Sequence, residues 1–384
     1  MGSTRNMQPK FRRRRQLAAA LALALVVLLV GTCVYVWYQR DVVAVRDFAG
    51  EGNGNVVMVR VSPGDSVDSL AEQLVDKGVV GSRRALMSAA ERKEPELQAG
   101  YYPLQEQMSA DKALDWLSSD DRRRGVVDIP NGLTLNDVKV VGGESRKGIF
   151  SLISQQTCQD EHTCVSVEDL RKAAAQTPPE QLEIADWAME KVKARGDDPK
   201  RIEGLISPGV HLFDPTSSPE EILKSLLNTS KEEYQDTGLV SSSQKVGLNP
   251  YDMLVAASLV EREAPEGDFD KVARVILNRL AEKQKLEFDS TVNYDLSEVE
   301  VATTDADRNR PTPWNTYAKE GLPETPISSP GLQALHAIEN PADGDWLYFV
   351  TVDRNGRTVF NRDFAAHERA IEESRRNGVL DSNR

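Results

Sequence analysis

The sequence predicts an α+β protein with a single N-terminal transmembrane helix, a small α/β module and a larger mixed α/β domain. An uncharged run of 22 residues follows a basic N-terminus, and residues 56–122 show a compact series of strand and helix patterns. Residues 123–375 combine further strands and helices with loops rich in glycine and proline. A linker at 39–55 and a tail at 376–384 complete the chain, whose 384 residues exceed one typical domain.

Residues 17–38 form the uncharged run, and they predict the membrane helix. As a helix they would span roughly 33 Å at about 1.5 Å per residue, which is enough to cross the core of a bilayer. A cleaved signal peptide is the alternative, but its apolar region is usually only about 7–15 residues long and ends at a small-residue cleavage site. Tyr35, Trp37 and Tyr38 end the run instead, which is typical of an aromatic belt at a membrane interface.

The charge distribution predicts the side of the membrane that each part occupies. Residues 1–16 form a tail with six basic residues and no acid, which favours the cytoplasmic side. Residues 39–384 are then expected on the outer side of the cell membrane, in a single-pass protein. Because the whole chain carries a formal charge of −13, this outer part is strongly acidic. Such a body excludes nucleic acid as a partner and disfavours binding to anionic lipid surfaces.

Two of the three cysteines predict a disulfide. Cys33 lies within the predicted membrane helix, whereas Cys158 and Cys164 lie in the outer part, in "TCQDEHTC". Closely spaced cysteines can oxidise outside the membrane, and two unpaired surface thiols are the alternative. A zinc site is not expected, because only His162 lies nearby and no second ligand pair has suitable spacing.

Residues 56–122 predict a small module of strand, helix, helix and strand. The valines of residues 56–61 alternate with other side chains, as in a half-buried strand. Apolar residues at helical spacing predict one helix after a Pro-Gly-Asp turn and a second after Ser82. Residues 97–104 predict the return strand, and Ser109 can cap a further helix. The opening "VSPGDSVDSLAEQL" resembles that of a LysM repeat, which would make the module glycan-binding. A spacer domain without a ligand is the alternative.

Residues 123–375 predict the larger mixed domain. A strand and a turn open it at 126–137, and residues 139–200, which contain the cysteine pair, are charged and helical. Ser218, followed by a proline, predicts the start of another helix. Asn355-Gly356 predicts a tight turn between two strands near the end of the domain, and a closing helix follows.

Several catalytic motifs are absent from the sequence. There is no Walker loop, no GxGxxG fingerprint, no HExxH pair and no G-x-S-x-G elbow. Because none of the four histidines is paired at i and i+4, neither a catalytic metal nor another cofactor is expected. Carboxylates, hydroxyls and amides remain, and these are the groups that carbohydrate chemistry uses.

Residues 250–263 predict a helix that ends in carboxylates. Asn249 can cap it, and the uncharged run at 253–260 predicts burial on all sides. Glu261 would then emerge from the core, whereas Glu263, two residues on, would face elsewhere and point away from the cleft. A solvated charge at a helix end is the alternative. Because a partly desolvated carboxyl has a raised pKa and can act as a general acid, Glu261 is the candidate catalytic residue.

Two further stretches have the composition of sugar-binding surfaces. Residues 287–295 crowd carboxylate, hydroxyl and amide side chains together, and residues 311–331 join proline-rich rigidity to aromatic and amide groups. Such groups together suit a sugar ring, and a surface loop with turn residues is the alternative for each stretch. The candidate substrate-binding residues are Asp289, Ser290, Thr291, Trp314, Asn315 and Tyr317.

An ordered set of motifs resembles the MltG (YceG-like) endolytic murein transglycosylases: "AASLVERE", "VILNRL", "DSTVNY", "WNTY", "GLPETPISSPG", "LYFV", and "VF" followed by His367. "IPNGLTL", "IEGLISPG", the membrane helix and the LysM-like module fit the same family. The likeness covers residues 56–372. Three features depart from the family pattern: "WNTY" in place of "YNTY", "SPGVHLFDP" in place of a "PDTY" form, and the segment with Cys158 and Cys164. These departures concern local geometry rather than activity.

This resemblance implies that residues 123–375 are a YceG-like catalytic domain with lyase activity on peptidoglycan. The family cleaves the β-1,4 bond between N-acetylmuramic acid and N-acetylglucosamine in nascent strands, leaves 1,6-anhydro-muramic acid ends and limits strand length. By position in "SLVERE", Glu261 matches the family's catalytic glutamate. The expected partners are peptidoglycan glycan strands, the membrane, and peptidoglycan synthases such as penicillin-binding proteins.

The implied mechanism needs one carboxylate, because the nucleophile is the substrate's own C6 hydroxyl. Glu261 would protonate the leaving oxygen and then, as a carboxylate, take the C6 hydroxyl proton. The N-acetyl and hydroxyl groups would be held by Ser290, Thr291, Asn315 and Tyr317.

Two other functions remain as alternatives. A hydrolytic muramidase would use Glu263 or Asp289 as a second carboxylate and would leave a reducing sugar. A non-catalytic envelope scaffold would bind glycan through residues 56–118 and would leave no new chain ends.

Overall fold

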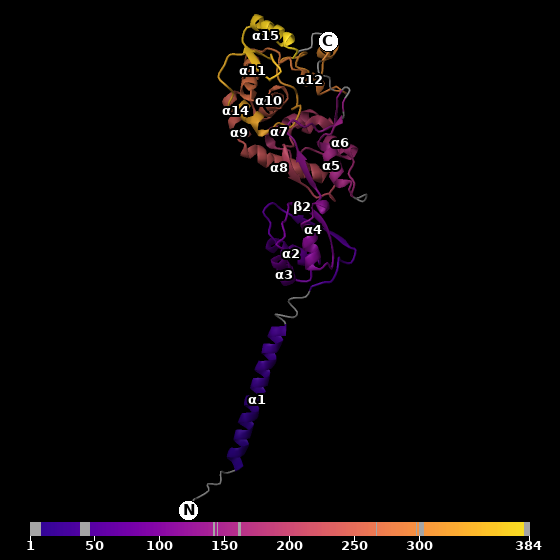
Figure 1. The fold of residues 1–384 in the computed structure, drawn as a ribbon, viewed down its shortest axis with the longest axis vertical. Coiled ribbons are helices and arrows are strands. Elements are labelled where there is room, and N and C mark those ends of the chain that lie inside the picture. Colours follow the sequence, from indigo (N-terminus) through magenta and orange to yellow (C-terminus); the bar gives the residue numbers. More distant parts are fainter. Residues whose placement is uncertain are drawn as a thin grey trace, which may run out of the picture. The chain divides into compact units, whose positions relative to one another are not determined.

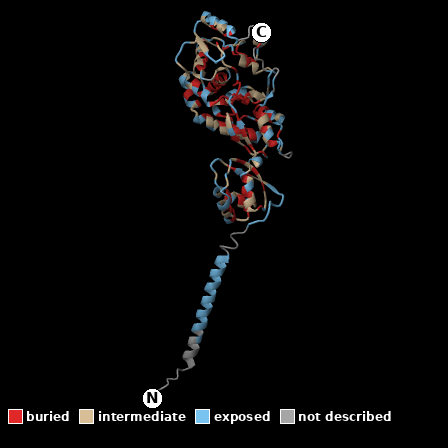
Figure 2. Ribbon diagram, in the orientation of Figure 1, coloured by how far each residue is buried: buried red, intermediate tan, exposed pale blue. Residues whose placement is uncertain are grey.

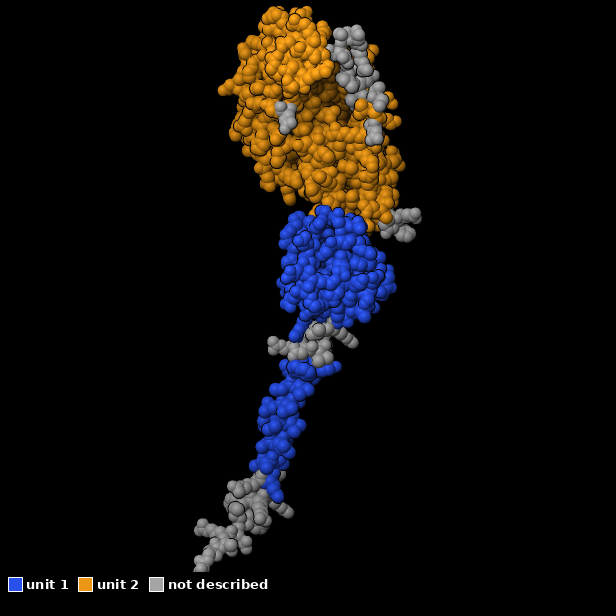
Figure 3. All heavy atoms as spheres, viewed as in Figure 1, with its two compact units in different colours: residues 1–123 blue, residues 124–384 orange. Residues whose placement is uncertain are grey.

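The computed structural model describes residues 9–38, 47–140, 143, 145–159, 163–265, 267–296, 298 and 303–379 (Figure 1). Arg5, residues 39–46 of the predicted linker, His162 and residues 380–384 of the predicted tail lie outside this part of the chain. The chain divides into two compact units, residues 1–123 and 124–384 (Figure 3). The division falls one residue after the predicted end of the small module.

The first unit begins with a long helix that contains the predicted membrane segment. This helix, α1, spans Pro9–Trp37. Its stretch Ala18–Trp37 is long and apolar enough to cross a membrane, by length and composition alone. Its large apolar side chains are exposed, as Leu21 shows with 69% of its surface accessible. Exposure of this many apolar groups to water is unfavourable, so the helix suits an apolar environment.

A pair of strands organises the rest of the first unit. β1, Val56–Val61, pairs antiparallel with β2, Gly100–Gln105. The period-two alternation buries Val59 and leaves Arg60 exposed, as expected for a half-buried strand. The helices of the module are α2, Val67–Asp76; α3, Arg83–Lys93; α4, Ala110–Leu117; and the short η2, Asp120–Arg122.

Side-chain caps begin the helices of this module where the sequence predicts them. The Ser82 hydroxyl accepts a hydrogen bond from the backbone N–H of Ala85, and the Ser109 hydroxyl accepts one from Lys112. The apolar face of each helix is buried, as the residues Leu74, Leu86 and Leu114 show. The predicted order of strand, helix, helix and strand is confirmed, and the likeness to LysM stays a prediction.

The second unit mixes helices with three two-stranded antiparallel ribbons, so the chain is a mixed α and β protein as predicted. The ribbons are β3, Val126–Ile129, with β6, Gly209–Leu212; β4, Val138–Lys139, with β5, Ser145–Arg146; and β7, Tyr348–Thr351, with β8, Thr358–Asn361. Gly356, with a φ of 85°, allows the predicted turn between the last two strands.

Helices are the main elements of the second unit, and the stretch 139–200 contains three of its α-helices and the start of a short 3-10 helix as well as the strand β5, so its predicted helical character holds in part. The first helices are α5, Ile149–Thr157; α6, Val167–Gln176; α7, Asp186–Ala194; η3, Pro199–Ile202; α8, Pro219–Asp236; α9, Leu239–Ser242; and η4, Ser243–Val246. The later ones are α10, Pro250–Glu263; α11, Phe269–Ala281; α12, Asp289–Asn293; α13, Asp305–Asn309; α14, Leu332–Glu339; and α15, Phe364–Arg376. The predicted disulfide between Cys158 and Cys164 is present after α5.

Helix α10 lies at the centre of the second unit and packs against α11 and α14 (Figures 1 and 2). Its start follows the sequence signals, because the Asn249 side chain accepts from the backbone N–H of Asp252 at 2.8 Å and Pro250 is the first helical residue. Every residue from Met253 to Val260 is buried, as the uncharged run predicts. A helix buried on all sides has a fixed position, and this fixes the side chains at its end.

Candidate functional site

Glu261 directly follows the buried run of α10 and is itself half-buried. One carboxylate oxygen, Oε2, accepts a hydrogen bond of 3.0 Å from the backbone N–H of Gly331. Among the residues that the structure describes, none donates to the other oxygen, Oε1. The backbone of Gly132 passes close by, since a Cβ there would lie 3.4 Å from Cγ of Glu261. The carboxyl group is thus held at one oxygen and open at the other, as a general acid needs to be.

Two local features hold the Gly331 segment against α10. Ser258, one turn before Glu261, accepts a hydrogen bond of 3.1 Å from the backbone N–H of Ile327, so this loop follows the helix closely. Gly331 is the N-cap residue of α14, which has no side-chain cap of its own. Glu261 therefore supplies an acceptor at a helix start, where N–H groups lack intrahelical partners and negative charge is favoured.

Burial raises the pKa of Glu261 above its ordinary value, because desolvation disfavours the carboxylate. The hydrogen bond from Gly331 and the positive charge of Arg262 oppose this shift without cancelling it. The carboxyl group is therefore protonated over a wider pH range than a solvated glutamate, and the Gly331 N–H still stabilises the anion. A group that first gives and then takes a proton needs both states to be accessible.

Glu263 faces a different element from Glu261, as predicted, and it makes a contact that the sequence did not indicate. Its Oε1 accepts a hydrogen bond of 3.2 Å from the backbone N–H of Ser290, in the first turn of α12. The helix α12 carries three of the predicted substrate-binding residues. Burial raises the pKa of Glu263, whereas the Ser290 side chain and backbone lower it. Glu263 therefore holds the segment that was predicted to meet the sugar.

The two predicted sugar-binding stretches lie together in the structure. The Tyr317 hydroxyl donates to Oδ1 of Asp289 at 2.8 Å, and the Thr303 hydroxyl donates to the same oxygen at 2.7 Å. Arg308 forms an ion pair with Oδ2 of Asp289 at 3.2 Å. Both oxygens of Asp289 are thus occupied. Asp289 and Tyr317 join the stretches at 287–295 and 311–331, and both remain partly exposed together with Ser290.

Thr291, Trp314 and Asn315 are buried, and their polar groups bind other parts of the protein. The Asn315 amide donates to three backbone carbonyls in the segment before it, and the Trp314 indole donates to Thr325 at 2.8 Å. The Thr291 hydroxyl donates to the carbonyl of Phe288. Burial of these three side chains favours a role in holding the loops over direct contact with a sugar.

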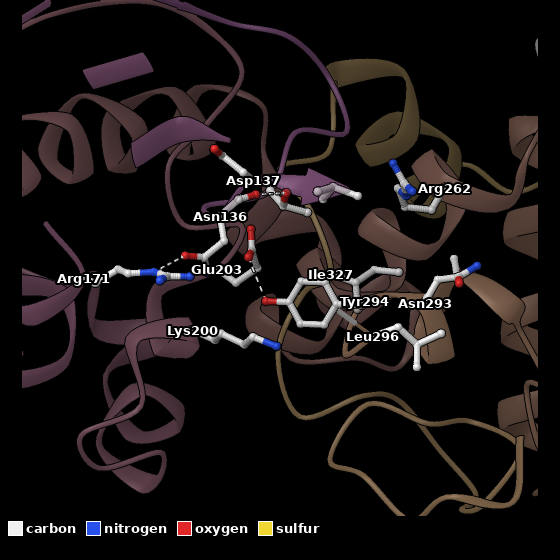
Figure 4. Close-up of a pocket in the computed structure, with 13 residues that line it drawn as sticks. Asn136, Asp137, Arg171, Lys200, Glu203, Arg262, Asn293, Tyr294, Leu296 and Ile327 are labelled. Carbon is white, nitrogen blue, oxygen red and sulfur yellow. Dashed lines mark hydrogen bonds between the residues drawn. The ribbon is translucent and has the colours of Figure 1, made fainter. Parts of the chain in front are cut away.

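A cavity of about 270 Å³ adjoins the end of α10, and Arg262 and Ser290 line it. Figure 4 shows Glu203 and Tyr294 in its wall, with the Tyr294 hydroxyl donating to Oε2 of Glu203 at 2.7 Å. Glu203 also accepts from the backbone N–H of Leu135 at 3.1 Å. Glu261 is not among the lining residues, because it faces Gly331 instead.

Glu203 is a site residue that the sequence interpretation did not single out. It is 0% exposed, and burial raises its pKa to about 7, against the lowering effect of Tyr294 and Leu135. The signal was the single acid in "RIEGLISPG", between Ile202 and a glycine-containing apolar stretch. A charged residue in such surroundings is seldom fully buried unless it has partners.

The described part of the chain contains no group of three or more histidine, cysteine, aspartate or glutamate side chains that could hold a metal ion. The half-buried carboxyl of Glu261 is able to transfer a proton, and Gly331, at the end of the 311–331 stretch, holds one of its oxygens. Fold and site together define a mixed α and β domain with a candidate acid–base glutamate at the end of a buried central helix.

The chain belongs to the YceG-like family, whose model matches residues 59–373. It is 27% identical over 324 residues to the endolytic murein transglycosylase of Bacillus subtilis, and the match covers 82% of this chain and 84% of the relative. It is 26% identical over 336 residues to the endolytic murein transglycosylase of Streptococcus pneumoniae serotype 2. That match covers 83% of this chain but 58% of the longer relative.

A solved structure supports the fold. The crystal structure of a YceG-like protein from Listeria monocytogenes resembles this chain with a TM-score of 0.50 and 24% sequence identity. The likeness covers 83% of this chain and 99% of the other. This likeness concerns the fold alone.

Proposed function

We propose that this protein is an endolytic lytic transglycosylase that cleaves the β-1,4 bond between N-acetylmuramic acid and N-acetylglucosamine in nascent peptidoglycan strands. The products would carry 1,6-anhydro-muramic acid ends, and cleavage would limit strand elongation. Membership of the YceG-like family and two relatives named endolytic murein transglycosylases support the reaction class. The observation that carries the proposal is the half-buried Glu261, held at one oxygen and open at the other.

The reaction requires two proton transfers at one carboxyl group. Protonated Glu261 gives its proton to the glycosidic oxygen as the bond from that oxygen to C1 breaks. The carboxylate then takes the proton of the C6 hydroxyl of the same muramic acid, while that oxygen bonds to C1. No water is consumed, and Glu261 ends protonated as it began. Attack within one sugar ring gains from proximity, so no second catalytic carboxylate is needed.

The occupied oxygens of Asp289 disfavour the hydrolytic alternative. A muramidase needs a second carboxylate that is free to attack C1 or to activate water. Asp289 is bound by Tyr317, Thr303 and Arg308, and Glu263 is bound to Ser290. We assign Ser290, Asp289 and Tyr317 to the surface that holds the sugar, with Thr291, Trp314 and Asn315 fixing the loops behind it.

The membrane anchor is part of the same proposal. The exposed apolar helix Ala18–Trp37 would span the cell membrane once, with the basic tail in the cytoplasm. Both the small module and the catalytic domain would then lie outside, where glycan strands are made. Peptidoglycan synthases, such as penicillin-binding proteins, are the partners expected there.

The test compares Glu261→Gln with Glu263→Gln. Glutamine at 261 can still accept from Gly331 but cannot transfer a proton, and each acid–base role is typically worth about 10²–10⁴-fold in rate. We expect activity near background for Glu261→Gln. Glutamine at 263 keeps an acceptor for the Ser290 N–H, so we expect a much milder loss.

The readout is mass spectrometry of the ends formed from uncrosslinked glycan strands. Anhydro ends support the proposal, reducing ends indicate the muramidase, and binding without new ends indicates the scaffold. The assignment of Glu261 fails if its glutamine variant keeps more than about a tenth of the activity, since that loss is too small for even one such role. Loss of activity in Glu263→Gln alone would show that the wrong carboxylate has been chosen.

A further inference from the structure

Two arginines from distant parts of the second unit meet beside Glu261. Nη2 of Arg146 donates to the backbone carbonyl of Gly132 at 3.2 Å, and Nη1 of Arg262 reaches the same oxygen at 3.5 Å. Gly132 is the residue whose backbone passes the Glu261 side chain. Both guanidinium groups therefore lie beside the Gly132 backbone that passes the candidate catalytic carboxyl.

Neither arginine forms a close ion pair among the residues that the structure describes, although the charges of Glu263, Glu261 and Glu203 act on Arg262 from a greater distance. Other arginines of this unit do form close ion pairs, as the pairs Arg195–Glu324 at 2.5 Å and Arg362–Glu282 at 2.9 Å show. The acids on either side of Arg262 in the chain bind backbone N–H groups instead, Glu261 that of Gly331 and Glu263 that of Ser290. In a chain with 60 acidic and 47 basic residues, two arginines without a contacting carboxylate together form a positive site.

The position of the pair leaves its donors open to a ligand. Arg146 and Arg262 are both exposed, and Arg262 also lines the 270 Å³ cavity. In Figure 4 Arg262 stands apart from Asn136, Asp137 and Glu203, and no dashed line reaches it. Each guanidinium carries five N–H donors, and the contact with the Gly132 carbonyl uses one from each arginine. Two guanidinium groups that share one carbonyl repel each other, and an anion bound between them would offset this repulsion.

We propose that Arg146 and Arg262 form a subsite that binds a carboxylate of the substrate next to the bond that Glu261 cleaves. The proposal rests on the proposed function for the identity of the substrate. Guanidinium groups suit carboxylates because two parallel N–H donors match the two oxygens. The subsite would select muramic acid strands over neutral glycans and would set the register of the strand relative to Glu261.

The carboxylate can come from two parts of a peptidoglycan strand. In peptide-bearing strands the lactyl group of muramic acid is amide-bonded, so the free carboxylates belong to the stem peptide. In strands stripped of peptide by an amidase, the lactyl carboxylate itself is free. Oligomers of N-acetylglucosamine have neither group, and they serve as the neutral reference.

The experiment measures binding of these three soluble ligands to the full chain in detergent, for the parent protein and for Arg146→Gln and Arg262→Gln. Lys147→Gln is the matched control, because Lys147 is the exposed neighbour of Arg146 and the same charge is removed. Arg262→Lys tests whether a positive charge without the planar guanidinium group is sufficient to bind the carboxylate. Repeating each titration at high salt reports the charge dependence.

We expect each arginine variant to lower the affinity for carboxylate-bearing strands about tenfold, which is the effect of one lost charged hydrogen bond. The affinity for N-acetylglucosamine oligomers should stay within about twofold of the parent value. If the arginine variants weaken binding only of peptide-bearing strands, the bound carboxylate belongs to the stem peptide. If they weaken binding only of stripped strands, the bound carboxylate is that of the lactyl group. Equal losses for the neutral oligomers, or an equal loss in Lys147→Gln, would overturn the subsite. Carboxylate-dependent binding without anhydro products would uphold the subsite and refute the proposed reaction.

Discussion

Glu203 makes the stability of the second unit depend on pH in a direction that can be worked out. Burial raises its pKa to about 7 from an ordinary value of 4.5. Between these two values the folded chain keeps a proton on Glu203 that the unfolded chain has lost. Since stability rises with pH only where the unfolded state binds more protons, this group makes the free energy of unfolding fall as pH rises from about 4.5 to about 7.

The size of the effect follows from the same two values. A shift of one pKa unit corresponds to about 1.4 kcal/mol, so the full shift corresponds to about 3 kcal/mol. This is a large share of the 5–15 kcal/mol that typically stabilises a domain. Below about pH 4.5 the carboxyl is protonated in both states and the contribution is complete, and above about pH 7 it has been lost.

The assay is urea unfolding of the detergent-solubilised chain between pH 4 and 8, for the parent protein and for Glu203→Gln. Glutamine has the same shape and does not titrate, so the difference between the two free energies of unfolding isolates Glu203 from other raised carboxyls such as Glu261 and Glu263. Tyr294→Phe removes a hydrogen bond that lowers the pKa of Glu203 and should move the window to higher pH. A difference that stays flat across this range would refute the raised pKa of Glu203.

Three further outcomes follow from named contacts. Gly132→Ala forces an alanine into a φ of +69° and places a Cβ 3.4 Å from Cγ of Glu261, so it should cost about 1 kcal/mol of stability and should also lower activity. Gly247→Ala, with a φ of +74° and no atom within 4 Å of its Cβ, should cost similar stability in a urea melt and leave anhydro product formation unchanged. Removal of the Cys158–Cys164 bridge by paired serines should destabilise the second unit by about 2–3 kcal/mol, and free thiols in non-reducing peptide maps of protein made in an oxidising compartment would contradict the bond. A protease added to cells stripped of their wall should degrade residues 39–384, and protection of that region would place it on the cytoplasmic side.

Local signals predicted most of the elements, because each depends on neighbours in the chain. The caps at Ser82, Ser109 and Asn249 and the buried run of α10 all lie where the residues place them. The disulfide could be predicted for the same reason, since Cys158 and Cys164 are six positions apart. In the site, local spacing was enough to separate the directions of Glu261 and Glu263.

The partners of these side chains could not be predicted from the sequence, because they come from distant segments. Gly331, which binds Glu261, is 70 positions away, and Tyr294, which binds Glu203, is 91 positions away. Composition alone could not show that Asn315 is buried and that its amide N–H groups donate to backbone carbonyls. An amide in a proline-rich loop serves equally well to bind a sugar or to hold the loop, and only burial distinguishes the two.

The end of α10 explains how one helix organises three loops. Successive helical residues point in directions about 100° apart, so Glu261, Arg262 and Glu263 reach different segments. Glu261 binds the start of α14, Arg262 reaches the Gly132 carbonyl, and Glu263 binds the start of α12. Because the preceding eight residues are all buried, the helix cannot turn about its axis without disrupting the core. Core packing therefore fixes the relative positions of Glu261, Arg262 and Glu263 at the end of the helix.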